Sequence, residues 1–334
     1  MRILVTGGAG YIGSHVVLAC RDAGYEVAVF DDLSTGRREA VPQDVPLIEG
    51  DIGDTDLVAK SLDAHGIRAV IHLAGRVVVP ESVLAPLKYY QANTVASRTL
   101  IEACVEASVE SFVFSSTAAV YGAPKQNPIT ENSPLEPVNP YGRSKLMTEW
   151  ILADASAAHG FGYLALRYFN VAGADPEGRT GQSTPQATHL IKVASETAVG
   201  VRDKVEIFGE DYETPDGTGI RDYIHVSDLA AAHVAGLRYL AAGGKSQAMN
   251  CGYGVGYSVR EVLRTVEQVS GRPLNIVSAP RRLGDPPALV ADSSRLQTEM
   301  EWTPKYADLT AMIESAIGWE KILIRGRDGK QSVE

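Results

Sequence analysis

The sequence predicts an α/β fold in which a doubly wound parallel sheet is followed by a smaller mixed α/β domain. Short apolar runs alternate with helical stretches from residue 1 to about residue 168. The runs lack period-two alternation, which is expected when both faces of a parallel sheet are covered. A glycine-rich turn joins the first run to the first helix, and this arrangement is typical of a Rossmann-type sheet.

Composition limits the classes of function. The chain has 334 residues, 45% hydrophobic and 22% charged, which fits a soluble globular protein with one large or two medium domains. A net charge of -10 without a long basic run argues against a nucleic-acid partner. The three cysteines show neither metal nor disulfide spacing, so we expect no metal site. No apolar run reaches membrane-spanning length, and a strand begins almost at the first residue, so we expect a cytoplasmic protein.

The strands of the sheet are expected at short β-rich runs: Ile3–Thr6, Val27–Phe30, Leu47–Glu49, Ala69–Leu73, Ser111–Ser115 and Tyr163–Tyr168. Two long helices are expected over Pro86–Ala107 and from Tyr141 to about Ala158. The pattern breaks after Tyr168, so we place domains at 1–170 and 171–325, with a polar tail at 326–334. Segments near 222–258 are expected to return to the first domain.

The second half is less regular. We expect helices at His189–Val199, Ser227–Ala241, Ser258–Val269 and Leu309–Ile324, and strands at Val205–Phe208, Asp222–Val226 and Leu274–Val277.

The glycine-rich turn indicates a dinucleotide site. In the run 6–13, Gly7 allows the tight turn, Gly10 lets the backbone approach a pyrophosphate, and Gly13 permits close packing of helix on strand. Asp31 ends the second strand, where an acid accepts the hydroxyls of the adenosine ribose. A carboxylate there repels a 2′-phosphate, so NAD is favoured over NADP, although Arg37 and Arg38 weigh against this.

Three further strand ends should point to the same crevice, because ligands of open α/β sheets lie beyond the carboxyl ends of the strands. These are Asp51-Ile52, which suits an adenine edge, Leu73-Ala74-Gly75, and residues 115–117. Ser and Thr at such ends also cap helices, so Thr117 alone is a weak candidate.

Tyr141 and Lys145 are four residues apart at the expected start of a helix, so they share one face of it. Pro140 suits the first helical position. A nearby ammonium favours the phenolate of a tyrosine, which would make the tyrosine a usable base. The spacing alone also fits an ordinary amphipathic helix, and the surrounding motifs must decide.

Taken together, these motifs resemble the extended short-chain dehydrogenase/reductase superfamily, and more narrowly the UDP-galactose 4-epimerases, from Met1 to about Trp319. Three stretches in the second half carry the narrower likeness: Arg167–Asn170, Asp216–Val226 and Arg281–Asp285. They are far more specific than the glycine motif.

The resemblance implies a tightly bound NAD and an exchange of UDP-glucose with UDP-galactose. C4 of the sugar would be oxidised, the 4-keto intermediate would rotate, and reduction would follow on the opposite face. Tyr141 would act as base and acid, with its pKa depressed by Lys145 and the positive nicotinamide, while Thr117 would hold the reacting oxygen. A homodimer through the two long helices is also implied.

The resemblance assigns the remaining residues of the site. Cofactor contacts would come from Gly7, Gly10, Tyr11, Ile12, Gly13, Asp31, Asp51, Ile52, Leu73, Ala74, Gly75, Asn93, Ser115, Tyr141, Lys145 and Tyr168. Contacts to the UDP-sugar would come from Thr117, Tyr141, Asn170, Leu190, Phe208, Arg221, Arg282, Asp285 and Leu289.

Two positions depart from the family pattern. Val77 stands where many epimerases carry a lysine near the cofactor phosphate, and Arg76 is a possible substitute for its charge. Leu289 stands at the gate of the sugar pocket, where a tyrosine narrows the site and a small residue admits N-acetyl sugars. Its intermediate size leaves UDP-pentoses and UDP-N-acetylhexosamines open as alternative substrates.

Two rival functions can be weighed on the sequence. A nucleotide-sugar 4,6-dehydratase needs an extra acid and base directly after its active-site threonine, and this chain has Ala118 and Ala119 there. A non-catalytic NAD-sensing regulator would typically lack the pair of Tyr141 and Lys145. Both rivals are therefore disfavoured.

Overall fold

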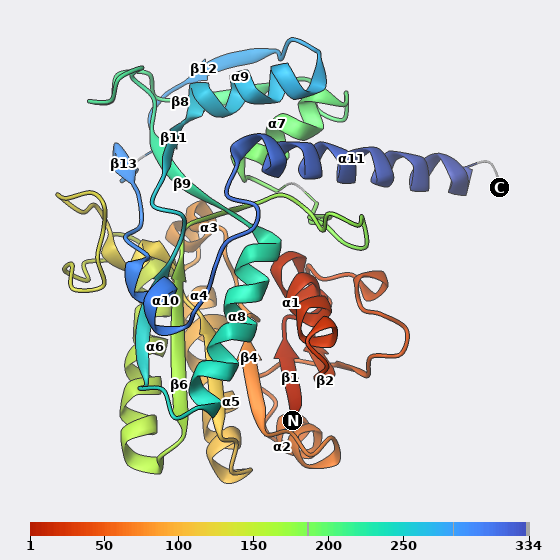
Figure 1. The fold of residues 1–334 in the computed structure, drawn as a ribbon, viewed down its shortest axis with the longest axis vertical. Coiled ribbons are helices and arrows are strands. Elements are labelled where there is room, and N and C mark those ends of the chain that lie inside the picture. Colours follow the sequence, from red (N-terminus) through yellow and green to blue (C-terminus); the bar gives the residue numbers. More distant parts are fainter. Residues whose placement is uncertain (186, 283, 332–334) are drawn as a thin grey trace.

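The central element of the protein is a parallel sheet (Figure 1). In this computed structural model, which describes residues 1–185, 187–282 and 284–331, the sheet has seven strands in the order β10-β6-β5-β4-β1-β2-β3. From β1 the strand numbers rise toward both edges of the sheet, which confirms the predicted doubly wound, Rossmann-type architecture. The strands are β1 (Arg2–Thr6), β2 (Glu26–Asp31), β3 (Leu47–Glu49), β4 (Ala69–His72), β5 (Ser111–Ser115), β6 (Gly162–Tyr168) and β10 (Gln247–Cys251).

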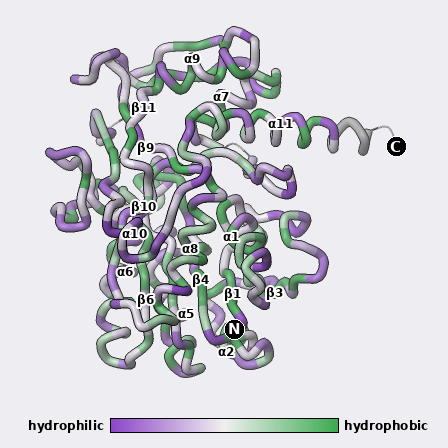
Figure 2. The backbone as a smooth tube through the Cα atoms, in the orientation of Figure 1, coloured by the Kyte–Doolittle hydropathy of each residue, from purple (hydrophilic) through white to green (hydrophobic). Residues whose placement is uncertain are grey.

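Helices cover both faces of this sheet. Helices α1 (Tyr11–Asp22) and α8 (Val226–Ala241) pack on one face, and α2 (Thr55–Ala64), α5 (Ala96–Glu106) and α6 (Pro140–His159) pack on the other. Successive side chains of a strand point to opposite faces, so Ile3 and Val5 enter one core while Leu4 enters the other. Figure 2 shows the hydrophobic colouring along the central strands and the hydrophilic colouring in the connecting loops.

The predicted helix over 86–107 is interrupted. The structure has α3 (Val79–Leu84), α4 (Pro86–Tyr90), a π-helical turn (Gln91–Val95) and then α5. Ala85 is not helical, at φ -133° and ψ 61°, because a residue before proline avoids the helical region. Single π-helical turns are frequent at functional sites.

A second, smaller lobe has its own sheets and its own core (Figure 1). Strands β7 (Asn170–Ala172), β9 (Ile220–His225), β11 (Gly256–Ser258) and β13 (Ala288–Leu289) form one sheet, and β8 (Val205–Phe208) pairs with β12 (Ile276–Ala279). The core is closed by α7 (Leu190–Ala198), α9 (Val259–Ser270) and α11 (Leu309–Gln331). Helix α10 (Ser294–Glu299) lies beside β10.

The chain passes from one sheet to the other more than once. It leaves the first sheet after Tyr168 and joins the second at Asn170, while α8 and β10 return to the first sheet from later in the sequence. Some element ends differ from the prediction. Helix α11 continues to Gln331 rather than Ile324, and β9 ends at His225 because the imidazole of His225 accepts a hydrogen bond from Ser227 N–H and caps α8.

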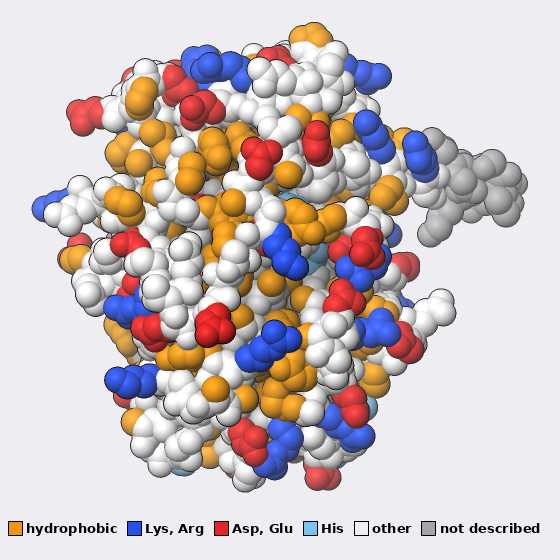
Figure 3. Space-filling model, in the orientation of Figure 1, with side chains coloured by type: hydrophobic (Ala, Val, Ile, Leu, Met, Phe, Trp, Pro, Cys, Tyr) orange, Lys and Arg blue, Asp and Glu red, His pale blue; other side chains and the backbone are white. Residues whose placement is uncertain are grey.

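The surface carries both signs of charge. Over the face seen in Figure 3, Lys and Arg side chains lie among Asp and Glu side chains. Among the helices of the described residues, none combines the length and the apolar character needed to cross a lipid bilayer.

Candidate functional site

Tyr141 and Thr117 meet at the carboxyl end of the sheet. Asn139 caps α6 by accepting a 2.8 Å hydrogen bond from Gly142 N–H, and Pro140 opens the helix, as predicted. Tyr141 therefore lies in the first turn, where its phenol is buried and hydrogen-bonded to the hydroxyl of Thr117. The structure thus brings together a phenol and a hydroxyl that the sequence separates by 24 residues.

Lys145 lies one turn further along α6. Its side chain is 3% exposed, its Nζ donates a 2.8 Å hydrogen bond to the carbonyl oxygen of Ser115, and it lies 4.7 Å from the centre of the Phe114 ring. Burial lowers the pKa of Lys145 to about 8, and the carboxylate of Glu149 raises it in part. The ammonium form therefore predominates at neutral pH.

The pKa of Tyr141 differs from the expectation. Burial raises it, and the hydrogen bond from Thr117 offsets that rise only in part. In the protein alone the direction is opposite to the predicted lowering by Lys145, because desolvation of the phenolate is the larger effect.

Ser115 and Tyr168 lie next to this pair. The phenol of Tyr168 and the hydroxyl of Ser115 are joined by a hydrogen bond. Burial and the nearby Tyr141 raise the pKa of Tyr168, so this phenol is neutral at physiological pH.

The glycine-rich turn has the shape that a dinucleotide requires. Gly7 has φ +69°, and a Cβ on it would lie 2.6 Å from the amide nitrogen of Ala74; a Cβ on Gly13 would lie 2.0 Å from the carbonyl oxygen of Gly7. Gly10 is the N-cap of α1. Because glycine has no side chain, no capping group covers the backbone N–H groups in the first turn of the helix. These features fit a bound pyrophosphate. The phenol of Tyr11 donates to the carbonyl oxygen of Gly173, at 2.7 Å.

Asp31 is fixed at the end of β2. Its two carboxylate oxygens accept hydrogen bonds from the N–H groups of Ala9 and Leu33, each at 2.9 Å, and burial raises its pKa. The carboxylate is thereby oriented next to the glycine-rich turn, where a ribose would bind.

The two arginines that weighed against NAD are paired with carboxylates. Arg38 pairs with Glu49, and Arg37 lies 3.8 Å from Glu39. Their charges are therefore partly matched within the protein, which weakens the case for a 2′-phosphate.

The other predicted cofactor residues lie around the same strand ends. Asp51 is exposed and accepts from Gly53 N–H at 2.8 Å, while Ile52 is buried in the core. Leu73 and Ala74 lie against Gly7, whose added Cβ would meet both of them. Ile12 follows Tyr11 in the first turn of α1.

Asn93 and Gly75 link the strand end after β4 to α6. The Asn93 amide donates to the carbonyl oxygen of Arg76 and to the hydroxyl of Ser144, each at 3.0 Å, and its oxygen accepts from Arg76 N–H at 2.7 Å. A Cβ on Gly75 would lie 2.9 Å from that oxygen and 3.9 Å from Nζ of Lys145. Contacts within the protein thus engage the side chain of Asn93, and its cofactor contact stays a prediction.

The predicted UDP-sugar residues form pairs in the second lobe. The Arg282 guanidinium lies 3.8 Å from the centre of the Phe208 ring. Arg221 lies 3.8 Å from the carboxylate of Asp285 and pairs in register with Leu289. Two predicted residues are placed only by their elements: Asn170 pairs with Tyr223 between β7 and β9, and Leu190 begins α7.

At the first position that departs from the family pattern, Val77 is 53% exposed and brings no charge. The positive charge of Arg76 is close enough to Glu81 on α3 and Tyr89 on α4 to favour the negative forms of these two side chains. Among the residues that the structure describes, no group of three or more His, Cys, Asp or Glu could hold a metal ion.

Sequence reasoning missed a buried polar cluster behind Lys145. The hydroxyl of Ser116 donates to the Glu149 carboxylate, which also forms a 2.6 Å ion pair with Arg167. Arg167 in turn donates to the phenol of Tyr121 at 3.0 Å. The available signal was spacing, because Glu149 follows Lys145 by four residues and so shares its helix face.

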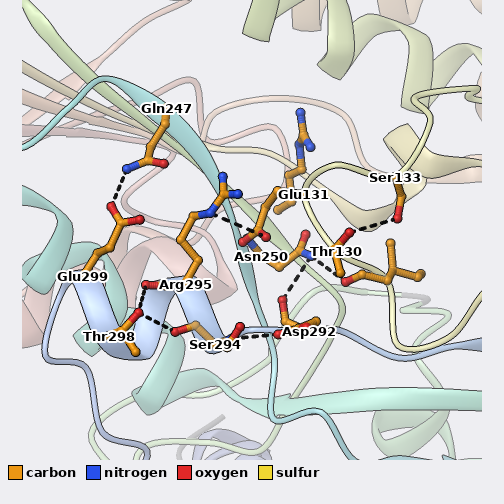
Figure 4. A network of polar contacts seen from close by, with 12 residues as sticks. Thr130, Glu131, Ser133, Gln247, Asn250, Asp292, Ser294, Arg295, Thr298 and Glu299 are labelled. Carbon is orange, nitrogen blue, oxygen red and sulfur yellow. Dashed lines mark hydrogen bonds and ion pairs between the residues drawn. The ribbon is translucent and has the colours of Figure 1, made fainter.

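The cluster continues toward the second lobe through Asn250. Tyr121 donates to its side-chain oxygen at 2.7 Å, and its amide donates to the carbonyl oxygens of Ile129 and Asp292. Figure 4 shows Asn250 between Glu131 and Asp292, with Arg295 beside Glu131.

Comparison with known proteins gives one family and close relatives. Residues 3–252 match the NAD dependent epimerase/dehydratase family. The chain is 59% identical over 322 residues to a UDP-glucose 4-epimerase of Azospirillum brasilense, covering 96% of this chain and 92% of that one. The crystal structure of UDP-glucose 4-epimerase from Brucella ovis in complex with NAD has TM-score 0.92 and 43% identity, covering 95% and 97%. The UDP-Glc/GlcNAc 4-epimerase of Campylobacter jejuni has TM-score 0.84 and 47% identity, covering 96% and 99%.

Proposed function

Because the chain belongs to the NAD dependent epimerase/dehydratase family, we propose that it is an NAD-dependent epimerase that interconverts UDP-glucose and UDP-galactose. The observation that carries this proposal is the buried phenol of Tyr141, hydrogen-bonded to Thr117 and followed one turn later by the ammonium of Lys145. A relative of almost the same length and 59% identity bears the name of this activity.

NAD is the cofactor, and when bound it supplies an acceptor and donor of hydride for C4 of the sugar. We propose that residues 1–170 form the domain that holds it, with the segments that return to the first sheet. Gly7, Gly10 and Gly13 would admit the pyrophosphate to the N-terminus of α1, and Asp31 would accept the hydroxyls of the ribose.

The proton chemistry is assigned to Tyr141. As a base it would take the proton of the 4-hydroxyl, and as an acid it would return the proton after the sugar has turned. The hydroxyl of Thr117, already bonded to the phenol, would hold the reacting oxygen within reach of it. Lys145 would offset the effect of burial on the phenol by placing a positive charge on the same helix face.

The second lobe, formed by residues 171–325 apart from the segments that return to the first sheet, would anchor the UDP group. Arg221 and Arg282 would form charge-assisted hydrogen bonds to the diphosphate. Asp285 lies beside Arg221, and Phe208 lies beside Arg282. Asn170 and Leu190 complete the assigned set. Anchoring through UDP leaves the sugar free to turn, which inversion at C4 requires.

The sugar range is set at Leu289. This side chain is half-buried at the register position opposite Arg221. Its bulk favours hexoses without an N-acetyl group, so we expect turnover on UDP-N-acetylglucosamine to be lower than on UDP-glucose. A rate on UDP-N-acetylglucosamine equal to or above that on UDP-glucose would overturn this assignment.

The direct test is incubation of the purified protein, without added NAD, with UDP-glucose, UDP-galactose, UDP-xylose and UDP-N-acetylglucosamine, followed by separation of the products. We expect interconversion of the first two and no ketone product. Tyr141→Phe should lower the rate by roughly two orders of magnitude or more while the NAD content stays unchanged. An unchanged rate, or accumulation of a keto sugar from the wild-type protein, would contradict the proposal.

We further propose that the protein is a homodimer through α3, α4 and α6. Large apolar side chains on these helices are exposed, among them Val83 (60%), Leu84 (86%), Leu87 (80%) and Trp150 (56%). An apolar surface of this kind is typical of a protein–protein interface. Light scattering of the wild type and of Leu84→Arg tests it: a dimer that becomes a monomer supports the proposal, and a wild-type monomer contradicts it.

We also propose that the protein works in the cytoplasm. Cys20, Cys104 and Cys251 are buried free thiols, a state that fits a reducing compartment. Fractionation of the source cells, with immunodetection of the chain, is the test.

A further inference from the structure

The turn that follows β5 meets α6 at three points. Two of them, at Tyr141 and Lys145, belong to the site already described. The third is the hydroxyl of Ser116, which donates to the carboxylate of Glu149. The three α6 residues follow one another at intervals of four, so they lie along one face of the helix. They contact three consecutive residues, Ser115 at the end of β5 and then Ser116 and Thr117.

The Glu149 carboxylate is fully engaged. It accepts hydrogen bonds from Nε of Arg167 at 3.0 Å, from Nη2 of Arg167 at 2.6 Å and from the hydroxyl of Ser116. Glu149 and Arg167 are both buried. Buried ion pairs contribute little to stability compared with apolar residues, so this pair calls for another explanation. Its contacts join α6, β6 and the turn after β5 next to the reacting groups.

We propose that Glu149 is a positioning residue for the reaction at this site. Its carboxylate holds residues 115–117 in register with α6, and so sets where the Thr117 hydroxyl and the Lys145 ammonium lie relative to the phenol of Tyr141. Glu149 does not contact those reacting groups through a hydrogen bond of its own; it acts through Ser116 and through its charge. This inference rests on the proposed function.

The charges around Lys145 support the inference. The imidazole of His72 on β4 is neutral, because burial and the charge of Lys145 lower its pKa to about 3. Burial raises the pKa values of Tyr141 on α6 and Tyr168 on β6, so both phenols are neutral as well. Glu149 is the negative group that favours the ammonium form of Lys145.

The first experiment compares Glu149→Gln with the wild-type enzyme. We expect kcat on UDP-glucose to fall roughly 10- to 100-fold, because the groups lose their alignment, while KM changes less than about threefold. The pH at which Lys145 loses its proton, followed by NMR of 13C-labelled lysine, should move to lower values. The matched control is Glu102→Gln, which changes an exposed glutamate paired with Arg98 on α5 and should alter neither quantity.

A second pair of variants separates positioning from stability. Glu149→Gln leaves the buried charge of Arg167 without a carboxylate partner, so it should lower Tm. Adding Arg167→Gln should restore much of the Tm while kcat stays low. Ser116→Ala keeps the ion pair and removes only the hydrogen bond to the turn, and it should lower kcat without moving the pKa of Lys145.

Recovery of kcat together with Tm in the double variant, or wild-type kcat in both Glu149→Gln and Ser116→Ala, would overturn the positioning role. If the wild-type protein turned over no UDP-sugar but Glu149→Gln still lowered the pKa of Lys145, the proposed function would fail while the link between Glu149 and Lys145 stood.

Discussion

The side-chain amide of Asn93 donates a 3.0 Å hydrogen bond to the hydroxyl of Ser144, the residue that precedes Lys145. Asn93 lies in the π-helical turn between α4 and α5, and its other two hydrogen bonds hold the backbone of Arg76. One amide thus joins the strand end after β4 to the helix that carries Tyr141.

We therefore expect Asn93→Ala to destabilise the protein. Truncation leaves the N–H and carbonyl of Arg76 and the Ser144 hydroxyl without this partner, which should lower the free energy of unfolding by about 1–3 kcal/mol. Urea denaturation measures the change. The control is Asn275→Ala, which removes one exposed hydrogen bond to Asp203 and should change stability by less than about 0.5 kcal/mol. Equal effects of the two substitutions would contradict this role of Asn93.

Thr117→Val keeps the shape of the side chain and removes its hydrogen bond to Tyr141. We expect kcat on UDP-glucose to fall roughly 10- to 100-fold with little change in KM, because in the proposed mechanism this bond aligns the reacting groups and takes no part in UDP binding. Thr117→Ser retains the hydroxyl and should keep most of the activity. Equal rates for the Val and Ser variants would show that the hydroxyl has no part in the reaction.

Gly142 allows α6 to begin close to the turn at residues 118–121. A Cβ there would lie 2.6 Å from the carbonyl oxygen of Ala119, so Gly142→Ala should separate the two segments and lower the free energy of unfolding by about 1–3 kcal/mol. Gly318→Ala is the matched control in α11, where a Cβ meets nothing within 4 Å. That substitution should stabilise by about 0.5–1 kcal/mol, and a Gly142→Ala protein as stable as wild type would refute the predicted clash.

Asp222 should give stability an unusual dependence on pH. Its carboxylate is buried and accepts hydrogen bonds from the N–H groups of Tyr253, Gly254 and Ala291, yet desolvation raises its pKa from 3.8 to about 6. The folded state thus binds this proton more tightly than the unfolded state. The contribution of Asp222 to stability is largest below about pH 4, falls as pH rises through about 6, and is constant above about pH 7.

Denaturation of the wild type and of Asp222→Asn at about pH 7.5 and about pH 5 tests this prediction. Between these values the wild type should gain about 1 kcal/mol relative to the variant as pH falls. A relative loss on acidification would mean that the pKa of Asp222 is lowered in the folded protein.

Asp31→Ala should reduce the NAD content of the purified protein, measured after acid release of the dinucleotide. The substitution removes the carboxylate that the N–H groups of Ala9 and Leu33 hold in place and that we propose accepts the hydroxyls of the ribose. The neighbouring Asp32 hydrogen-bonds Ser34 in an exposed turn, so Asp32→Ala should retain NAD. Full retention of NAD by Asp31→Ala would remove Asp31 from the cofactor site.

The sequence was sufficient for features that depend on local pattern. The strand runs and the glycine spacing predicted the first sheet, and Pro140, which suits the first helical position, placed Tyr141 in the first turn of α6. These features follow from backbone geometry and hydrophobic periodicity, which a single chain reveals.

The parts that were missed depend on contacts between distant segments. Glu149, Ser116 and Arg167 meet only because α6, β5 and β6 pack together. The spacing of Glu149 from Lys145 gives its helix face but not its partners in other elements. The π-helical turn was missed for the same reason, because the partners of Asn93 lie in other elements. The raised pKa of Tyr141 depends on burial, which spacing alone does not report.

The repeated crossing of the chain between its two lobes makes them hard to separate. Cutting after residue 170 would remove α8 and β10, and so would uncover one edge and one face of the first sheet, including Val113 and Leu164, which pack in the same core as Leu237. If a protease cut one connection between the lobes, the other connections of the chain between them would still hold them together. The fragment 1–170 should therefore aggregate when expressed alone, and should recover only when residues 171–334 are supplied in trans.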